Sequence, residues 1–101
     1  MSPGGSVITA IVLIQAEADR IPEAAQAIAD LDGVTEVYSC AGDVDLIAMI
    51  RVGEHERLAE IIPGGIGRVP GVVDTDTHIA FRSYSRQDIE ATFSLGLENG
   101  D

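Results

Sequence analysis

A short pattern that occurs twice limits the folds open to this chain more than any other feature. Residues 31–36 read LDGVTE, and residues 69–74 read VPGVVD. In both places an apolar segment stops at a glycine and a valine-containing segment follows at once. Glycine supplies the left-handed conformation that ends many helices, and β-branched runs favour strands. The chain therefore contains two equivalent helix–stop–strand units, an internal repeat that is typical of a split β-α-β arrangement.

Further strands and helices are expected around these units. Residues 7–16 are β-branched and apolar on both faces, which predicts a strand that is covered on both sides. A helix is expected to start at Ile21, because Pro22 favours the first turn of a helix. Residues 34–41 and 46–52 flank a short Gly/Asp connection, which predicts the two strands of a hairpin.

The second half of the chain repeats this plan. A helix is expected from about Glu54 and is interrupted by Pro-Gly-Gly at residues 63–65. A fourth strand follows over residues 72–82, and a capping pattern predicts a short C-terminal helix over residues 87–95. The order β-α-β-β-α-β places the chain in the α+β class, as a ferredoxin-like sandwich with a short C-terminal helix.

The length of 101 residues predicts one domain. We expect it over residues 7–97, between a flexible leader at residues 1–6 and a flexible tail at residues 98–101. The leader lacks the basic residues of a secretory signal, and no apolar run reaches the roughly 20 residues of a membrane span. The single cysteine, Cys40, allows no internal disulfide. These features predict a cytoplasmic protein.

One face of the expected sheet has no cover within the chain. Two helices cover one face of a four-stranded sheet, yet the first and third strands are apolar on both faces. An exposed apolar face of this size marks an interaction site. A second copy of the chain is the simplest cover, so the sequence predicts a homodimer.

The charge of the chain restricts its partners. Seventeen acidic residues outnumber six basic ones, all of them arginine, for a formal net charge of −11. DNA and RNA phosphates repel such a chain, and it has no basic stripe to overcome the repulsion. Anionic membranes repel it for the same reason. We therefore expect no direct contact with nucleic acid or membrane.

Three short motifs stand in a recognisable order. They are GVTEVY at residues 33–38, GDVDL at residues 42–46 and VPGVVDTDT at residues 69–77. Inside a β-α-β-β-α-β frame they resemble the effector-binding domain of the leucine-responsive regulator and AsnC (Lrp/AsnC) family, over about residues 7–82. Full-length members carry an N-terminal helix-turn-helix domain, and this chain is similar to the effector-binding domain alone.

The resemblance implies a fold, an assembly and a ligand. Domains of this family have the ferredoxin-like fold of the dimeric α/β-barrel type, pair through their sheets and assemble as rings of dimers. A small amino acid binds between dimers, without catalysis, cofactor or metal. The implied role is a sensing and oligomerisation module that regulates transcription indirectly or through a protein partner such as a full-length regulator. By position, the effector-binding residues are Ser39, Gly42 and Asp45 from the hairpin, and His78, Ile79 and Ala80 from the fourth strand of a neighbouring dimer.

An amino-acid zwitterion matches the chemistry of these residues. Asp45 would accept a hydrogen bond from the ammonium group, and Gly42 would let backbone N–H groups approach the carboxylate. Ile79 and Ala80 would contact the ligand side chain. Asp45 also fits a second role, the capping of its own turn, and the sequence leaves both roles open.

Other interpretations stay open beside this one. Ferredoxin-like dimers include enzymes, and an enzyme would need a cavity that contains His78 and an acid. A ring-forming scaffold would need no effector. Asp74, Asp76 and His78 share a predicted strand face and have the donor types of a metal site, although solvated strand residues fit the pattern as well. Residues 63–65 and His78 depart from the usual family pattern.

Overall fold

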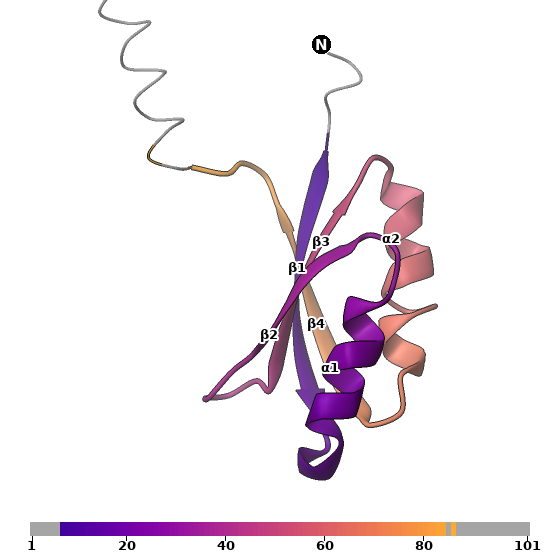
Figure 1. Ribbon diagram of the computed structural model, residues 1–101. Helices are drawn as coiled ribbons and strands as arrows, with labels where there is room; N and C mark the ends of the chain where they lie inside the picture. The colour runs from indigo at the N-terminus through magenta and orange to yellow at the C-terminus, as the bar shows by residue number, and fades with distance from the viewer. Residues whose placement is uncertain (1–6, 85, 87–101) are drawn as a thin grey trace, which may run out of the picture.

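A computed structural model describes residues 7–84 and Arg86 of the chain (Figure 1). The elements are β1 (Ile8–Ala16), η2 (Ala18–Arg20), α1 (Ile21–Ala29), β2 (Val34–Ser39), β3 (Leu46–Val52), α2 (His55–Ile61), η3 (Ile66–Arg68) and β4 (Val72–Ala80). This order confirms the predicted β-α-β-β-α-β frame. The predicted leader, tail and C-terminal helix lie outside the described residues. Within the described part, no helix has the length and apolarity that a membrane span needs.

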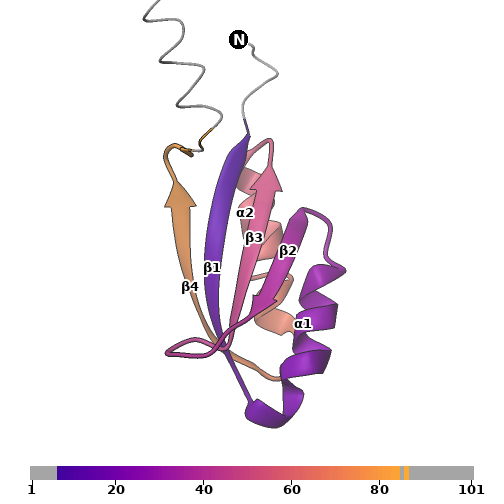
Figure 2. The same cartoon turned by 60° about the vertical axis from the view of Figure 1, so that its left-hand side comes forward.

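The four strands form one antiparallel sheet in the order β2-β3-β1-β4 (Figure 2). β1 lies inside the sheet and pairs with both β3 and β4, so Ile14 stands opposite Leu46 on one side and Thr75 on the other. β2 and β4 are the two edges. Both helices lie on one face of the sheet, which leaves the other face without a cover from the described chain (Figure 1). This is the ferredoxin-like arrangement that the sequence predicts.

Two strands end earlier than predicted. β2 ends at Ser39, because the backbone N–H of Cys40 already closes the hairpin turn with a 2.9 Å hydrogen bond to the carbonyl of Asp45. β4 ends at Ala80, whose partner Thr9 is the last residue of β1 in register with it. Residues 81–84, which follow β4, therefore lie outside the strand ladder.

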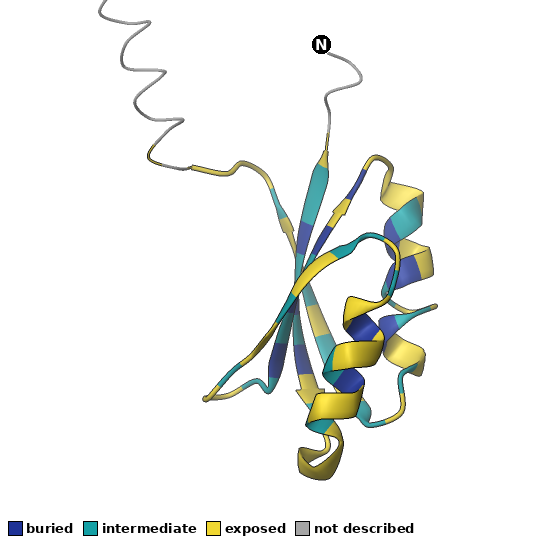
Figure 3. Ribbon diagram, in the orientation of Figure 1, coloured by how far each residue is buried: buried dark blue, intermediate teal, exposed yellow. Residues whose placement is uncertain are grey.

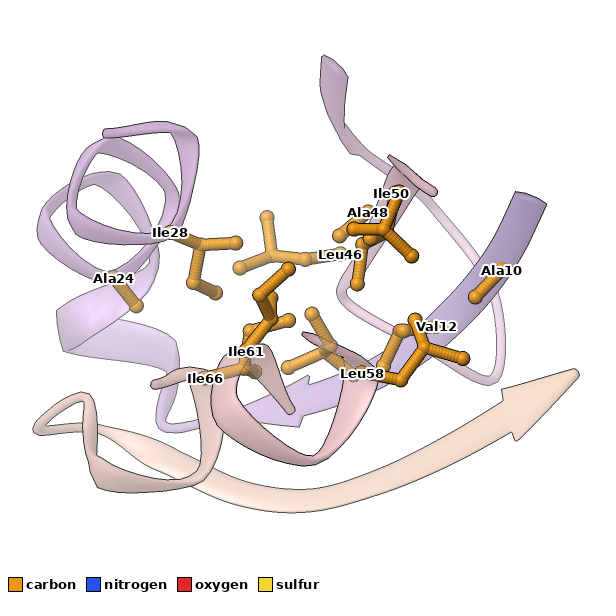
Figure 4. Packing of buried hydrophobic residues seen from close by; sticks show 12 residues of the cluster. Ala10, Val12, Ala24, Ile28, Leu46, Ala48, Ile50, Leu58, Ile61 and Ile66 are labelled. Carbon is orange, nitrogen blue, oxygen red and sulfur yellow. The ribbon is translucent and has the colours of Figure 1, made fainter. Parts of the chain in front are cut away.

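The core lies between the sheet and the two helices (Figure 3). Residues of β1 and β3 alternate between the two faces, and from Ala10 to Ile14 and from Leu46 to Val52 every second one is buried under the helices. Figure 4 shows these side chains meeting those of the helices. The fully buried members are Ala10, Val12, Ile14, Ala24, Ile28, Leu46, Ala48, Ile50 and Ile66.

The Pro-Gly-Gly interruption after α2 has a structural role. A Cβ atom at Gly64 or Gly65 would lie 2.6 Å from a carbonyl oxygen of α2, so the chain passes too close for a larger residue. The short turn η3 follows and returns Ile66 to the core, where it is fully buried. The interruption therefore supplies a core residue that a continuous helix would place elsewhere.

Apolar side chains also populate the uncovered face of the sheet. Ile11 and Leu13 of β1 pair with Met49 and Ile47 of β3, and all four are only partly buried. We call this surface the open face. Its apolar centre agrees with the sequence-based expectation of a surface that needs a partner.

Candidate functional site

Hydrogen bonds join the hairpin turn between β2 and β3 to the end of β1. The backbone N–H of Asp45 donates to the carbonyl of Ile14 at 2.9 Å. The Oδ2 atom of Asp45 accepts a 2.8 Å hydrogen bond from the backbone N–H of Ala16. Gln15 Nε2 adds a longer contact of 3.4 Å to the carbonyl of Asp43. The turn is thus held in one position although it lies at the end of the sheet.

The middle of the same turn keeps free hydrogen-bond donors. Within the described residues, the backbone N–H groups of residues 41–44 have no acceptor. Gly42 has a φ of 135°, and a Cβ placed there would meet nothing within 4 Å. The backbone is therefore open to an approaching group, and its free N–H groups can donate hydrogen bonds to an anion.

The side chain of Asp45 bonds to the end of β1 and makes no hydrogen bond to its own turn among the described residues, so it does not perform the turn capping that the sequence left open. Its bond to Ala16 lies where β1 and β4 shift register, so the carboxylate satisfies a backbone donor at this irregularity. A carboxylate accepts several hydrogen bonds through two oxygens. No other hydrogen bond to this side chain occurs in the described chain. Capping of β1 leaves Oδ1 available for a second donor.

The three predicted residues of β4 do not share one surface. His78 pairs with Ile11 and Ala80 with Thr9, so both belong to the open face. Ile79 pairs with the buried Ala10 and belongs to the helix face, where it is 42% exposed. His78 Nε2 lies 3.3 Å from Asp76 Oδ2, and both side chains are exposed.

One chain does not bring the hairpin and the β4 residues together. Ser39 and Leu46 stand at the level of Ile14 and Thr75 in the sheet. Ala80 lies five residues beyond Thr75, about 16 Å along the strand at roughly 3.3 Å per residue. The hairpin and β4 also lie at opposite sides of the sheet order. A site built from both sets needs more than one copy of the chain, and its composition stays a prediction.

A tyrosine–glutamate pair lies on the β2 side of the open face. Tyr38 stands opposite Ile47, and its hydroxyl donates a 2.7 Å hydrogen bond to Glu36 Oε2. The hydrogen bond and the negative charge of Glu36 raise the pKa of Tyr38 above 10.0. Glu36 thus favours the protonated phenol, and the pair of side chains forms a polar edge beside the apolar centre of the open face.

A hollow that no sequence pattern predicted lies at the end of the open face, where β3 and β4 finish. It has a volume of about 880 Å³. Ile11 and Met49 of the open face line it, and so do two arginines, Arg51 and Arg82. Phe81 and Tyr84, just after β4, also line it. The available signal was a pair of aromatic residues that flank an arginine directly after a strand.

The described residues give little support to the two alternatives of a metal site and an enzyme active site. They contain no group of three His, Cys, Asp or Glu side chains arranged to hold a metal ion. The large hollow contains no histidine and no acid, and a smaller one of about 360 Å³ beside Gly53 contains no histidine. An acid–base pair that includes His78 is therefore absent from both hollows.

Comparison with protein families gives a match over most of the chain. The model that describes the Lrp/AsnC ligand binding domain matches residues 9–89. A curated relative, the HTH-type transcriptional regulator FL11 of Pyrococcus horikoshii, is 31% identical over 80 residues, covering 79% of this chain and 52% of that protein. The chain thus spans about half the length of the curated relatives it matches.

Solved structures agree with the fold. TTHA0845 of Thermus thermophilus is 43% identical, with a TM-score of 0.74 over 78% of this chain and 99% of that chain. A regulator of Neisseria meningitidis, solved as a complex with L-Met, is 11% identical with a TM-score of 0.70, over 78% of this chain and 53% of that one. The second likeness concerns the fold alone.

Proposed function

Because the chain belongs to the family of Lrp/AsnC ligand-binding domains, we propose that it is a non-catalytic sensor of a free amino acid. The ligand binds at the hairpin turn between assembled copies. Its binding changes the assembly or its contact with a partner protein. The proposed setting is the cytoplasm, and the proposed output is the regulation of transcription.

One observation carries the proposal. The turn at residues 41–44 presents free backbone N–H groups directly beside the carboxylate of Asp45. The N–H groups would donate to the ligand carboxylate, and Asp45 Oδ1 would accept from the ligand ammonium. An amino acid carries its ammonium and its carboxylate on one carbon, so it could bind the turn N–H groups and Asp45 at the same time. The L-Met complex of the distant Neisseria regulator supports this ligand class.

Assembly is the second part of the proposed function. The open face carries Ile11, Leu13, Ile47 and Met49 without a cover from the described chain. We propose that a second copy covers it, and that such dimers associate further into a ring. The separation of the hairpin from His78 and Ala80 supports this arrangement, because a neighbouring dimer would supply the second half of the site.

Regulation of transcription would then depend on another polypeptide or domain. The net charge of −11 opposes direct contact with DNA. The curated relatives are named HTH-type regulators and are about twice as long as the matched segment. A full-length regulator of this family is the proposed partner, because its ligand-binding half has the same fold and can join the same assembly.

A ligand screen tests the proposal. The standard amino acids are added singly at millimolar concentration, and the melting temperature of the protein is followed. A ligand present at about 100 times its Kd stabilises the folded state by about 2.7 kcal/mol, a shift of several degrees for a domain of this size. One selective shift supports the sensor. No shift with any amino acid overturns it and favours the scaffold interpretation.

Two variants locate the site. Asp45→Asn keeps an oxygen that can accept the Ala16 N–H but removes the charge that would bind the ammonium. Asp43→Asn is the matched control, because it removes the same charge from an exposed neighbour in the same turn. We expect the first variant to abolish the ligand shift and the second to keep it. Equal behaviour of the two variants would place the ligand elsewhere.

A further inference from the structure

The hollow at the end of the open face has a charge opposite to that of the whole chain. None of the residues that line it is acidic, and two of them, Arg51 and Arg82, are arginines. The chain as a whole carries seventeen acidic and six basic residues, for a net charge of −11. In the part of the chain that the structure describes, neither arginine makes a side-chain hydrogen bond or an ion pair. An anion that enters the hollow would therefore meet two positive charges that no carboxylate of the lining offsets.

Strand pairing brings the two arginines to the same end of the open face. Arg51 stands opposite Thr9 of β1, and Thr9 stands opposite Ala80 of β4. Arg51 and Ala80 thus lie at one level, two strands apart, about 10 Å at roughly 4.8 Å per strand. Arg82 follows two positions after Ala80. One small molecule can span such a distance, so both guanidinium groups can serve a single ligand.

The remaining lining of the hollow suits an aromatic body. Ile11 and Met49 supply partly buried apolar side chains. Phe81 is fully exposed, at 103%, and Tyr84 is 73% exposed. Phenylalanine is mostly buried in folded proteins, and an exposed ring offers a face on which another planar group can stack. The volume of about 880 Å³ lies in the range of small-molecule sites, which combine an apolar lining with a few charged or polar groups.

From these observations we infer that the hollow is a second binding site, for a small organic anion that carries a carboxylate or a phosphate on an aromatic body. The guanidinium groups of Arg51 and Arg82 donate hydrogen bonds to the anion, and the rings of Phe81 and Tyr84 contact its body. The hollow has no acid that would hold an ammonium group. It therefore favours an acid without an amino group, whereas the hairpin turn with Asp45 suits an amino acid.

Three matched compounds test the charge that the hollow selects. Phenylacetate is the anion, phenylacetamide lacks the charge, and L-phenylglycine adds an ammonium group to the same body. Each is titrated into the unchanged protein to millimolar concentration, and the NMR methyl signals of Ile11 and Met49, which line the hollow, are followed. We expect phenylacetate to shift these signals with a Kd at least about tenfold lower than that of either other compound. Equal affinity for phenylacetate and phenylacetamide, or no shift with phenylacetate, overturns the inference.

Two double variants test whether the arginines of the hollow hold the anion. R51Q/R82Q removes both positive charges from the lining. R20Q/R68Q is the matched control, because it changes the net charge equally at two exposed arginines that do not line the hollow. We expect the first variant to raise the Kd of phenylacetate at least about tenfold and the control to leave it nearly unchanged. Equal weakening in both variants would mean that net charge alone attracts the anion, and it would overturn the inference.

Phenyl phosphate distinguishes the two classes of anion. If it binds the hollow more tightly than phenylacetate does, the site belongs to phosphate esters, and the reverse order assigns it to carboxylic acids; either order supports the inference. The hollow is lined by residues of one chain and rests on no part of the proposed function. The titrations are therefore repeated in Asp45→Asn, where we expect the anion to bind as before even if every amino acid fails to bind.

Discussion

The carboxylate of Asp45 binds the backbone N–H of Ala16 at 2.8 Å, across 29 positions of sequence. This bond joins the hairpin turn to the end of β1, at the point where β1 and β4 change register. The residue that the family resemblance assigns to the ligand is therefore also a structural residue. Any experiment on the ligand site has to separate these two roles.

Substitution of Asp45 tests the structural role directly. Asp45→Ala leaves the partly buried N–H of Ala16 without an acceptor, and we expect a loss of about 1–3 kcal/mol in unfolding free energy. Asp45→Asn retains an acceptor oxygen and should lose less than about 1 kcal/mol. Urea denaturation measures both values. Equal losses in the two variants would show that charge, and not the acceptor, stabilises the turn.

Substitution by alanine should lower the unfolding free energy by different amounts at Gly33, which precedes β2, and at Gly42, which lies in the hairpin turn. Gly33 has a φ of 101°, and its Cβ would lie 2.5 Å from Cδ1 of the buried Ile61. We expect Gly33→Ala to cost about 2 kcal/mol or more, because backbone strain adds to the displacement of Ile61. Gly42→Ala meets open space and should cost only the strain, about 1–2 kcal/mol. Denaturation midpoints give the order, and the reverse order would contradict it.

The contribution of Ile66 tests the role of the Pro-Gly-Gly interruption. Ile66 is fully buried although it follows the break in α2. We expect Ile66→Ala to lower the unfolding free energy by about 2–5 kcal/mol, and the matched variant Ile66→Val by about 0.5–1.5 kcal/mol. A loss below 1 kcal/mol for Ile66→Ala would show that η3 contributes little to the core.

The pH dependence of Tyr38 follows from its contact with Glu36. The hydrogen bond and the charge of Glu36 raise the pKa of Tyr38 in the folded protein above 10.0. Its contribution to stability is therefore fully present below the pKa of an unfolded tyrosine. It is lost as the pH rises through the higher pKa of the folded state.

Spectrophotometric titration of the phenolate band checks this shift. The titration is done in a Tyr84→Phe background, which leaves Tyr38 as the one tyrosine, because the chain has only two. Glu36→Gln should return the pKa of Tyr38 toward its ordinary value, because the negative charge is gone. An unchanged titration curve would mean that Glu36 does not control the phenol in solution.

The sequence by itself determined the elements and their order. Gly33 and Gly71 mark the two helix–strand junctions, and both adopt the positive φ values that only glycine tolerates easily. The apolar residues on both faces of β1 and β3 predicted a sheet that needs a cover on both faces. These signals are local, because turn chemistry and side-chain alternation depend on neighbouring residues.

Only the tertiary structure decided which residues meet. The pairing of β1 with β3 and β4 puts Asp45 beside Ala16, and the same register separates the hairpin from His78 and Ala80. It also gathers Phe81, Tyr84, Arg51 and Arg82 around one hollow. Such contacts depend on the long-range register of the strands, and a shift of one residue would turn every side chain to the other face.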